Sequence, residues 1–412
     1  MSVVTPFRAL RPGRQFAQAV ASPPYDVVTL EEATAIVRAN PLSFLRVEKS
    51  EIDVGDGGEE TAIYQTAKAN LDRLVQEGVL HQDGKACFYL YRQKTGSHEQ
   101  TGLAAGISIA EYESGLIRKH EQTRADKEAD RIRHVLAVNA QTGPVFVTYF
   151  GRPAIDSLVA RIAAGLPEYD FAAEDGVAHT VWVIDDPKDI FEIVDEFSKV
   201  DRLYIADGHH RAAAAAAVGT MKRKGNPRPR GEAPSERMMA VLFPSDQIRI
   251  MAYNRVVRDL AGLDENEFLR RVGSTFDIAA DPAGKSPAGL HEFGMYLRGL
   301  WYALKAKEGL YDRQDLVHTL DVSILQDHLL GPVLGIEDPR TNGRIDFVGG
   351  VKGTMYLEGL VDSKAYDVAF SLFPTTLQQL IDIADAGKVM PPKSTWFEPK
   401  LRSGLFIHSL DS

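Results

Sequence analysis

Residues 203–217 read LYIADGHHRAAAAAA, and this stretch sets the fold around the region where chemistry is expected. Leu203, Tyr204 and Ile205 are typical of a buried strand, and the six alanines that follow the turn favour a helix. Gly208 permits a sharp turn between the two elements. The sequence therefore predicts a strand, a turn and a helix in direct succession. The polar residues and the glycine of the turn are Asp207, Gly208, His209, His210 and Arg211.

This turn has the composition of an anion-binding site. Unpaired backbone N–H groups and the positive end of the helix dipole favour an anion at a helix N-terminus. Arg211, His209 and His210 would converge on that anion, and a phosphate is the expected guest. Asp207 is predicted to bind Mg²⁺, or to act as a base on a hydroxyl group that receives or loses a phosphoryl group. The alternative is a plain turn in which Asp207 caps the helix and the histidines are solvated.

The composition is that of an ordinary globular protein. The chain has 412 residues, of which 44% are hydrophobic and 25% are charged. No stretch of 18 apolar residues occurs, the N-terminus lacks the apolar core of a signal peptide, and the single Cys87 excludes an intrachain disulfide. A cytoplasmic protein without membrane contact is therefore expected. The formal net charge of −10 disfavours nonspecific binding of nucleic acid.

Strand and helix patterns are mixed along the chain, which predicts a mixed α/β fold with sheets covered by helices. A helix capped by Thr29 is expected first, and residues 41–49 are expected to form a strand. Residues 1–220 are predicted to form one α/β domain that carries the motif. Residues 237–412 are predicted to form a second α/β domain, whose basic C-terminal segment returns to the site. The Pro- and Gly-rich residues 221–236 between them are expected to be a mobile loop.

Two further polar segments are candidate parts of the same site. In residues 118–143, helical spacing places Lys127, Arg131 and His134 on one face, and Glu121 precedes this helix. The second segment, GKVMPPKSTWFEPKLRSG at 387–404, combines cations, hydroxyl groups and aromatic rings, which suit a nucleotide or a phosphorylated metabolite. Its candidate binding residues are Lys393, Ser394, Thr395, Lys400 and Arg402. The alternatives are a solvated helix with ion pairs for the first segment and a packed tail for the second.

Eight motifs together resemble a widespread bacterial and archaeal family known only as a domain of unknown function. The motifs are RALRP, ASPPYDVV, NPLSFLRV, KHEQTRADKEADR, YIADGHHRAAAA, YNRVV, DPRTNGRIDFVGG and MPPKSTWFEPKLRSG. The resemblance spans nearly the entire chain. Members of that family are often encoded beside enzymes of serine biosynthesis, which points toward a small hydroxylated or phosphorylated amino acid as ligand.

One motif resembles a wider group. D-G-x-H-R at the start of a helix is similar to the signature of the ParB and sulfiredoxin superfamily, which includes nucleotide-binding partition proteins, sulfiredoxin and a free-serine kinase. The resemblance implies a strand-turn-helix phosphate site and matches Asp207, Gly208, His210 and Arg211 to its phosphate-handling motif. For the catalytic glutamate of such a kinase, Glu121 is our choice ahead of Glu128 and Glu174.

These observations favour a phosphotransferase that moves a phosphoryl group between a nucleotide, ATP or ADP, and the hydroxyl of serine or a similar metabolite. Positioning and charge neutralisation carry most phosphoryl-transfer catalysis. We expect Asp207 to bind Mg²⁺, Glu121 to deprotonate the acceptor, and Lys393 and Lys400 to neutralise the donor phosphates. With water as acceptor, the same site would be a phosphatase of phosphoserine or a similar metabolite.

Two other classes of protein stay open. One is a non-catalytic, nucleotide-gated protein similar to the partition proteins, which the acidic charge opposes. The other is a metal hydrolase that uses His209, His210 and a distant acid, although no H-E-x-x-H spacing accompanies them. A homo-oligomer is compatible with every reading.

Overall fold

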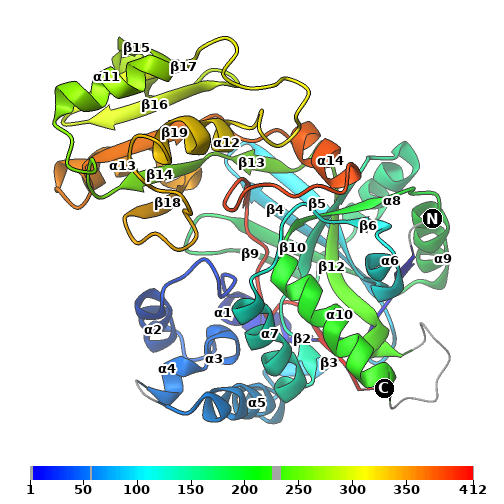
Figure 1. Ribbon diagram of the computed structural model, residues 1–412. Helices are drawn as coiled ribbons and strands as arrows, with labels where there is room; N and C mark the ends of the chain where they lie inside the picture. The colour runs from blue at the N-terminus through cyan, green and yellow to red at the C-terminus, as the bar shows by residue number, and fades with distance from the viewer. Residues whose placement is uncertain (1–2, 56–57, 225–232, 412) are drawn as a thin grey trace. The chain divides into compact units, whose positions relative to one another are not determined.

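The computed structural model describes residues 3–55, 58–224 and 233–411 (Figure 1). Contacts divide the chain into two compact units. Unit 1 comprises Met1–Lys119, Thr123–Ile248 and Pro399–Ser412, and unit 2 comprises His120–Gln122 and Arg249–Glu398. No helix among the described residues is long and apolar enough to cross a membrane.

Unit 1 is built on a mixed sheet, which has nine strands within the described residues. Along the sheet they are β6 (Ile117–Arg118), β11 (Leu203–Asp207), β8 (Val145–Tyr149), β12 (Arg237–Pro244), β5 (His98–Ser108), β4 (Phe88–Thr95), β10 (Ala178–Ile184) and β9 (Tyr169–Ala172), with β1 (Val4–Thr5) paired to β5. β11 runs parallel to β6 and antiparallel to β8. The mixed α/β class expected from the sequence is confirmed.

Helices pack on this sheet through their apolar sides. The buried core joins Leu203 and Ile205 of β11 to Ala212 and Ala215 of the helix that follows. Helix α8 (Pro153–Ala163) contributes Leu158 to the same core, and helix α9 (Pro187–Ser198) contributes Phe197. The helices of unit 1 are α1 (Ala17–Val20), α2 (Leu30–Ala39), α3 (Leu45–Glu48), α4 (Glu51–Val54), α5 (Glu60–Gln76), α6 (Ile109–Glu113), α7 (Ala125–Val138), α8 (Pro153–Ala163), α9 (Pro187–Ser198) and α10 (His209–Arg223).

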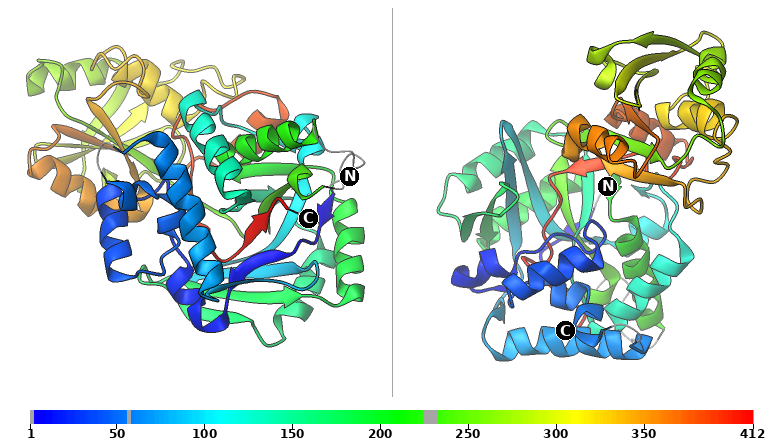
Figure 2. Two further views of the ribbon diagram at one scale, coloured as in Figure 1. Left: turned by 90° about the horizontal axis from the view of Figure 1, so that it is seen from below. Right: turned by 90° about the vertical axis from the view of Figure 1, so that its left-hand side faces the viewer.

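A smaller sheet of unit 1 brings both ends of the chain together. Its strand order is β3 (Leu80–Gln82), β2 (Ala9–Pro12), β21 (Ile407–Ser409) and β7 (Ala140–Gln141). The C-terminal strand β21, red in Figure 2, thus lies beside the N-terminal strand β2, in blue. The last segment of the chain therefore belongs to the unit that carries the DGHHR motif.

Unit 2 contains a second, antiparallel sheet. Its order is β15 (Phe276–Ala280), β17 (Leu300–Ala306), β16 (Glu292–Leu297), β19 (Val368–Leu372), β14 (Tyr253–Val257) and β18 (Ile345–Gly349). The strands β13 (Arg249–Met251) and β20 (Trp396–Glu398) form a separate pair. The helices of this unit are α11 (Glu265–Thr275), α12 (Asp321–Leu325), α13 (Gly353–Asp362) and α14 (Leu377–Asp385).

The domain boundary expected at 221–236 differs from this division. β12 lies between β5 and β8 in the sheet of unit 1, because Met238, Ala240 and Leu242 are buried in its core. Unit 1 therefore continues to Ile248 and resumes at Pro399. Half of the predicted mobile loop, residues 225–232, lies outside the described residues, and its first three residues instead continue helix α10 to Arg223.

Two local predictions had opposite outcomes. The Thr29 helix cap is confirmed, since its side chain accepts a hydrogen bond from the backbone of Glu32 and the Glu32 side chain accepts one in return. The strand expected at 41–49 is wrong, because this segment contains the short helix α3. Phe44 and Leu45 are fully buried there, and this burial outweighs the strand preference of the sequence.

Candidate functional site

The strand-turn-helix unit predicted at 203–217 is present, with β11 ending at Asp207 and α10 beginning at His209. Gly208 lies between them in the left-handed region, at φ 90°. A side chain at this position would be strained, and its Cβ would lie 3.3 Å from Cζ of Arg211. No side chain caps the N-terminus of α10. The backbone N–H groups in the first turn of a helix point outward from its end, where an anion can bind them.

Asp207 forms an ion pair with a lysine from the other end of the chain. Nζ of Lys400 lies 2.8 Å from Oδ2 of Asp207, and both side chains are largely buried. The backbone N–H of Gly208 donates to Oδ1 at 2.8 Å. Burial opposes ionisation of this carboxyl, but Lys400 and Arg211 hold its pKa below the ordinary value. Asp207 is therefore a carboxylate at neutral pH.

Arg211 is held beneath the turn. It donates from Nη1 to the carbonyl oxygen of Pro144 at 2.5 Å. Burial alone would lower the pKa of this guanidinium, yet the carboxylates of Asp26 and Asp207 keep it above its ordinary value. The turn thus combines one fixed cation with carboxylates from two different segments.

The two histidines of the motif are the first two residues of α10. His209 is 5% exposed, and His210 is half-buried. The backbone N–H of Arg124 donates to Nε2 of His210 at 3.1 Å. Arg124 is the N-cap of α7, and this helix also lacks a side-chain cap. Because Nε2 accepts, a neutral His210 carries its proton on Nδ1.

A small buried cavity lies behind Arg211, with a volume of about 20 Å³. Its polar lining includes Glu48, Arg131, His134 and Arg211. Nη1 of Arg131 lies 3.4 Å from Oε2 of Glu48, and its guanidinium lies 4.1 Å from the ring centroid of Tyr25. Burial lowers the pKa of His134, which therefore stays neutral. This cluster fixes the back of the turn.

Of three predicted binding residues of unit 1, Lys127, Arg131 and Arg402, two are paired with carboxylates other than Asp207. Lys127 is exposed on α7. Arg131 is buried and bound to Glu48 and Asp130, so its contacts resemble those of a structural ion pair. Arg402 is paired with Asp175. The structure therefore brings Lys400 of the predicted set to Asp207 and gives Arg131 and Arg402 carboxylate partners of their own.

Lys393, Ser394 and Thr395 belong to unit 2, which also holds the contacts of Lys393 with Tyr253 and of Ser394 with Pro391. Nζ of Lys393 lies 5.5 Å from the ring centroid of Tyr253, and its carbonyl oxygen accepts from Arg255 at 2.9 Å. Ser394 donates to the carbonyl oxygen of Pro391 at 2.6 Å, and Thr395 is half-buried. Their assignment to a phosphate donor stays a prediction.

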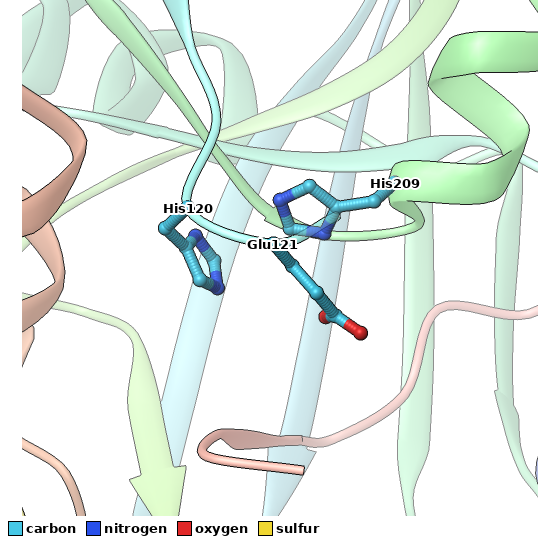
Figure 3. A group of neighbouring side chains, drawn as sticks. All are labelled: His120, Glu121 and His209. Atoms are coloured by element: carbon cyan, nitrogen blue, oxygen red, sulfur yellow. The ribbon is translucent and has the colours of Figure 1, made fainter. Parts of the chain in front are cut away.

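Glu121 lies in the loop between β6 and α7. The tripeptide 120–122 is grouped with unit 2, but it is joined at both ends, through Lys119 and Thr123, to unit 1. Figure 3 shows the side chains of His120, Glu121 and His209, and one potential ligand atom of each lies within 4.8 Å of the others. Two imidazoles and a carboxylate suit a transition metal better than Mg²⁺. The catalytic role of Glu121 stays a prediction.

The residues around Asp207 give limited support to its predicted role as a Mg²⁺ ligand. Mg²⁺ prefers oxygen ligands and is usually held by one or two carboxylates together with substrate phosphates. Both oxygens of Asp207 already accept hydrogen bonds, from Lys400 and from Gly208. A cation would have to share an oxygen with one of these donors, so no step of the chemistry below is assigned to it.

Sequence reasoning missed several residues around Arg211. They are Tyr25, Asp26 and Glu48. Tyr25 and Asp26 stand in ASPPYDVV, a motif that carried the family resemblance but no assigned chemistry. Two polar residues after paired prolines were the available signal, because prolines hold such a segment extended and fix its direction.

A comparison with protein families matches residues 4–323 to DUF1015, described as a protein of unknown function. This match spans well over half of the chain. The chain belongs to the DUF1015 family. The resemblance to a family of unknown function is thereby confirmed, whereas membership of the ParB and sulfiredoxin superfamily stays a prediction. A comparison with curated proteins found no match.

Solved structures offer distant likenesses to this DUF1015 protein. A free serine kinase in complex with AMP is 14% identical, with a TM-score of 0.39, and the match covers 74% of this chain and 91% of that one. A conserved hypothetical protein from Pyrococcus furiosus is 14% identical, with a TM-score of 0.36 and coverages of 74% and 94%. SbnI with C-terminal truncation from Staphylococcus aureus is 11% identical, with a TM-score of 0.39 and coverages of 74% and 86%. Likenesses at this level carry no argument about function.

Proposed function

We propose that this protein is a phosphotransferase that acts on a small hydroxylated metabolite, most specifically a nucleotide-dependent kinase of free serine. The observation that carries the proposal is the polar turn at the uncapped N-terminus of α10, where Asp207 is paired with Lys400 and backed by Arg211. Helix-end N–H groups and fixed cations together suit a transferring phosphoryl group. The choice of serine rests on the D-G-x-H-R resemblance stated above.

Several residues at this turn can take separate roles in phosphoryl transfer. The N–H groups of the first turn of α10 bind the phosphoryl oxygens, and Arg211 with Lys400 neutralises their charge. Asp207 orients Lys400 through their ion pair. We also propose that Asp207 would share one of its oxygens with Mg²⁺ when the donor phosphates are bound. His210 accepts a hydrogen bond from the backbone N–H of Arg124 at Nε2 and lies at the same helix end, so its Nδ1–H is the donor that it would offer to a phosphate.

A base must remove the proton from the acceptor hydroxyl. We propose Glu121 for this role, because it is the carboxylate of the loop that leads into α7. Asp26 is a second candidate, because its charge acts on Arg211. The variants Glu121→Gln and Asp26→Asn show which of the two residues is the base. The variant that lacks the base is expected to have a lower kcat and an unchanged KM for the donor, whereas the other variant is not.

The test follows phosphate transfer by ³¹P NMR. The full-length protein is incubated with Mg²⁺, serine and one donor at a time from ATP, ADP, CTP and pyrophosphate. The expected result is donor-dependent formation of phosphoserine that is lost in Asp207→Asn and kept in Asp195→Asn, an exposed carboxylate on α9. Release of inorganic phosphate from phosphoserine without a donor would instead identify a phosphatase. If no phosphoserine forms with any of the four donors, the result would contradict the serine kinase proposal.

A further inference from the structure

A groove beside α10 is a second concave feature of unit 1. It has a volume of about 490 Å³ and is open to solvent. Residues of α10 form one side of it, and residues around α6 and the start of α7 form the other, among them Tyr112 and Thr123. A groove of this size is large enough for a nucleoside.

The groove begins one helical turn beyond the polar site. Ala213 and Ala217 lie four and eight residues after His209, and such spacing places residues on the same face of a helix. With a rise of about 1.5 Å per residue, the two alanines lie about 6 Å and about 12 Å along the axis from His209. A ligand in the groove can therefore reach the N-terminus of α10 with an attached chain of phosphates.

The floor of the groove, formed by α10, carries three alanines. Ala213, Ala216 and Ala217 contribute only methyl groups to it. Tyr112 adds a half-buried aromatic ring, with Nζ of Lys119 lying 5.0 Å from its centroid. A small-residue floor beside an aromatic ring suits a planar nucleobase, which binds by stacking and by apolar contact.

The rim of the groove carries two carboxylates whose positions are fixed by hydroxyl groups. Thr123 donates to Oε2 of Glu128 at 2.6 Å, and Thr220 donates to Oε1 of Glu113 at 3.0 Å. Carboxylate oxygens accept hydrogen bonds from amino groups and from ribose hydroxyls, but they repel phosphates. Lys119 and Lys224 also line the groove, so its charges are mixed. The two carboxylates supply the hydrogen-bond acceptors that suit the base and ribose of a nucleotide.

We propose that this groove binds the base and ribose of the phosphoryl donor, a nucleoside di- or triphosphate whose base carries an exocyclic amino group. The phosphates of this nucleotide then lie at the Asp207–Arg211 turn. The inference rests on the proposed function in one respect, namely that the donor is a nucleotide. The inference adds a binding site for the base and ribose of the donor, which are not changed by phosphoryl transfer.

The test fills the groove without touching the polar turn. Ala217→Leu places a larger side chain on its floor, and leucine is a good helix former. Isothermal titration with ADP and with pyrophosphate is compared for the wild type, for this variant and for Ala160→Leu, a matched change at an exposed position of α8. We expect Ala217→Leu to weaken ADP binding at least tenfold, with pyrophosphate binding and the melting temperature unchanged. Ala160→Leu is expected to bind both ligands as the wild type does.

A second variant guards against a folding artefact. Glu128→Gln keeps the shape of the rim but removes a charge, and it is expected to weaken ADP binding more than binding of inosine diphosphate, which lacks the amino group. Equal ADP affinity in the wild type and Ala217→Leu would overturn the inference, as would ADP binding no tighter than pyrophosphate binding.

The inference and the proposed function can fail separately. Serine phosphorylation by pyrophosphate, with no binding of ADP, would refute the groove as a nucleoside site and leave the phosphotransferase standing. ADP binding that is lost in Ala217→Leu, without phosphorylation of serine, would support the groove and refute the serine kinase.

Discussion

Asp207 shows how one buried carboxylate is kept charged in this protein. Lys400 and the Gly208 N–H satisfy its two oxygens, and Arg211 adds a further positive charge. An ion pair with this burial is sensitive to the loss of either partner, because the remaining charge is left without compensation. The pair therefore links the C-terminal segment to the polar turn energetically as well as spatially.

Replacing Lys400 by methionine tests this link. We expect Lys400→Met to lower the free energy of unfolding by about 3 kcal/mol, because it leaves the Asp207 carboxylate unpaired. The double variant Asp207→Asn/Lys400→Met is expected to recover much of the loss. Urea denaturation measures the four members of this cycle, with Lys199→Met as a control at an exposed ion pair. Additive losses would show that the two side chains do not interact.

His179 gives the stability of unit 1 a defined pH dependence. It is completely buried between Tyr91, which contacts Nδ1, and Arg402, which donates to Nε2. Burial, reinforced by Arg402, lowers the pKa of His179 to about 3. The unfolded chain takes up a proton near pH 6.5 and the folded chain does not, so this contribution to stability is present above pH 6.5 and is lost as the pH falls toward 3.

Substitution of His179 should therefore flatten the pH profile. Between about pH 7 and about pH 5, the wild type is expected to lose about 2 kcal/mol more unfolding free energy than His179→Gln. Urea denaturation at the two pH values measures the difference, and exposed His81→Gln is the matched control. Parallel profiles for the wild type and His179→Gln would contradict a neutral His179.

The junction of β11 and α10 was predictable because its signals are local. Apolar residues, a glycine and a run of alanines follow one another within fifteen residues, and each favours the element it forms. The capping box of α2 was predictable for the same reason. Residues 41–49 were not, since their burial by distant segments decided a helix over a strand.

A substitution at Gly208 tests whether the turn between β11 and α10 is needed for phosphoryl transfer. Gly208→Ala forces an alanine into the left-handed region, which costs about 1 to 2 kcal/mol, and it crowds Arg211. Gly78→Ala imposes similar backbone strain at φ 70° with nothing within 4 Å. We expect both variants to lose stability by similar amounts and Gly208→Ala alone to lose phosphoryl transfer, as measured by thermal melts and turnover. Equal activity in the two variants would show that the turn has no role in catalysis.

In the chain as a whole, the C-terminal segment Pro399–Ser412 belongs to unit 1 together with the N-terminal part of the sequence. The sequence predicted that this segment approaches the motif, but no pattern could pair Lys400 with a carboxylate 193 residues away. The unit boundary was missed for a related reason: β12 follows a Pro- and Gly-rich stretch that reads as a linker, yet it completes the first sheet. Strand order in a sheet depends on long-range pairing that local patterns do not encode.

The anchoring of this segment can be measured at Phe406. Its ring is fully buried and lies 5.1 Å from the ring of Tyr89 and 5.8 Å from that of Tyr91. Phe406→Ala is expected to lower the free energy of unfolding by about 3 to 5 kcal/mol. Phe191→Ala, at a position 71% exposed, is expected to have little effect. Denaturation of both variants checks this, and an unchanged midpoint in Phe406→Ala would show that the segment does not stabilise unit 1.

The turnover of an Arg211→Lys variant tests most directly whether phosphoryl transfer takes place at the Asp207–Arg211 turn. Lysine keeps the positive charge but cannot reproduce the planar guanidinium that the turn holds beneath Gly208. With the donor identified by ³¹P NMR, kcat/KM for phosphoserine formation is expected to fall about a hundredfold or more. Arg161→Lys, on the exposed side of α8, should match the wild type. Wild-type turnover by a folded Arg211→Lys variant would contradict a phosphotransfer site at this turn.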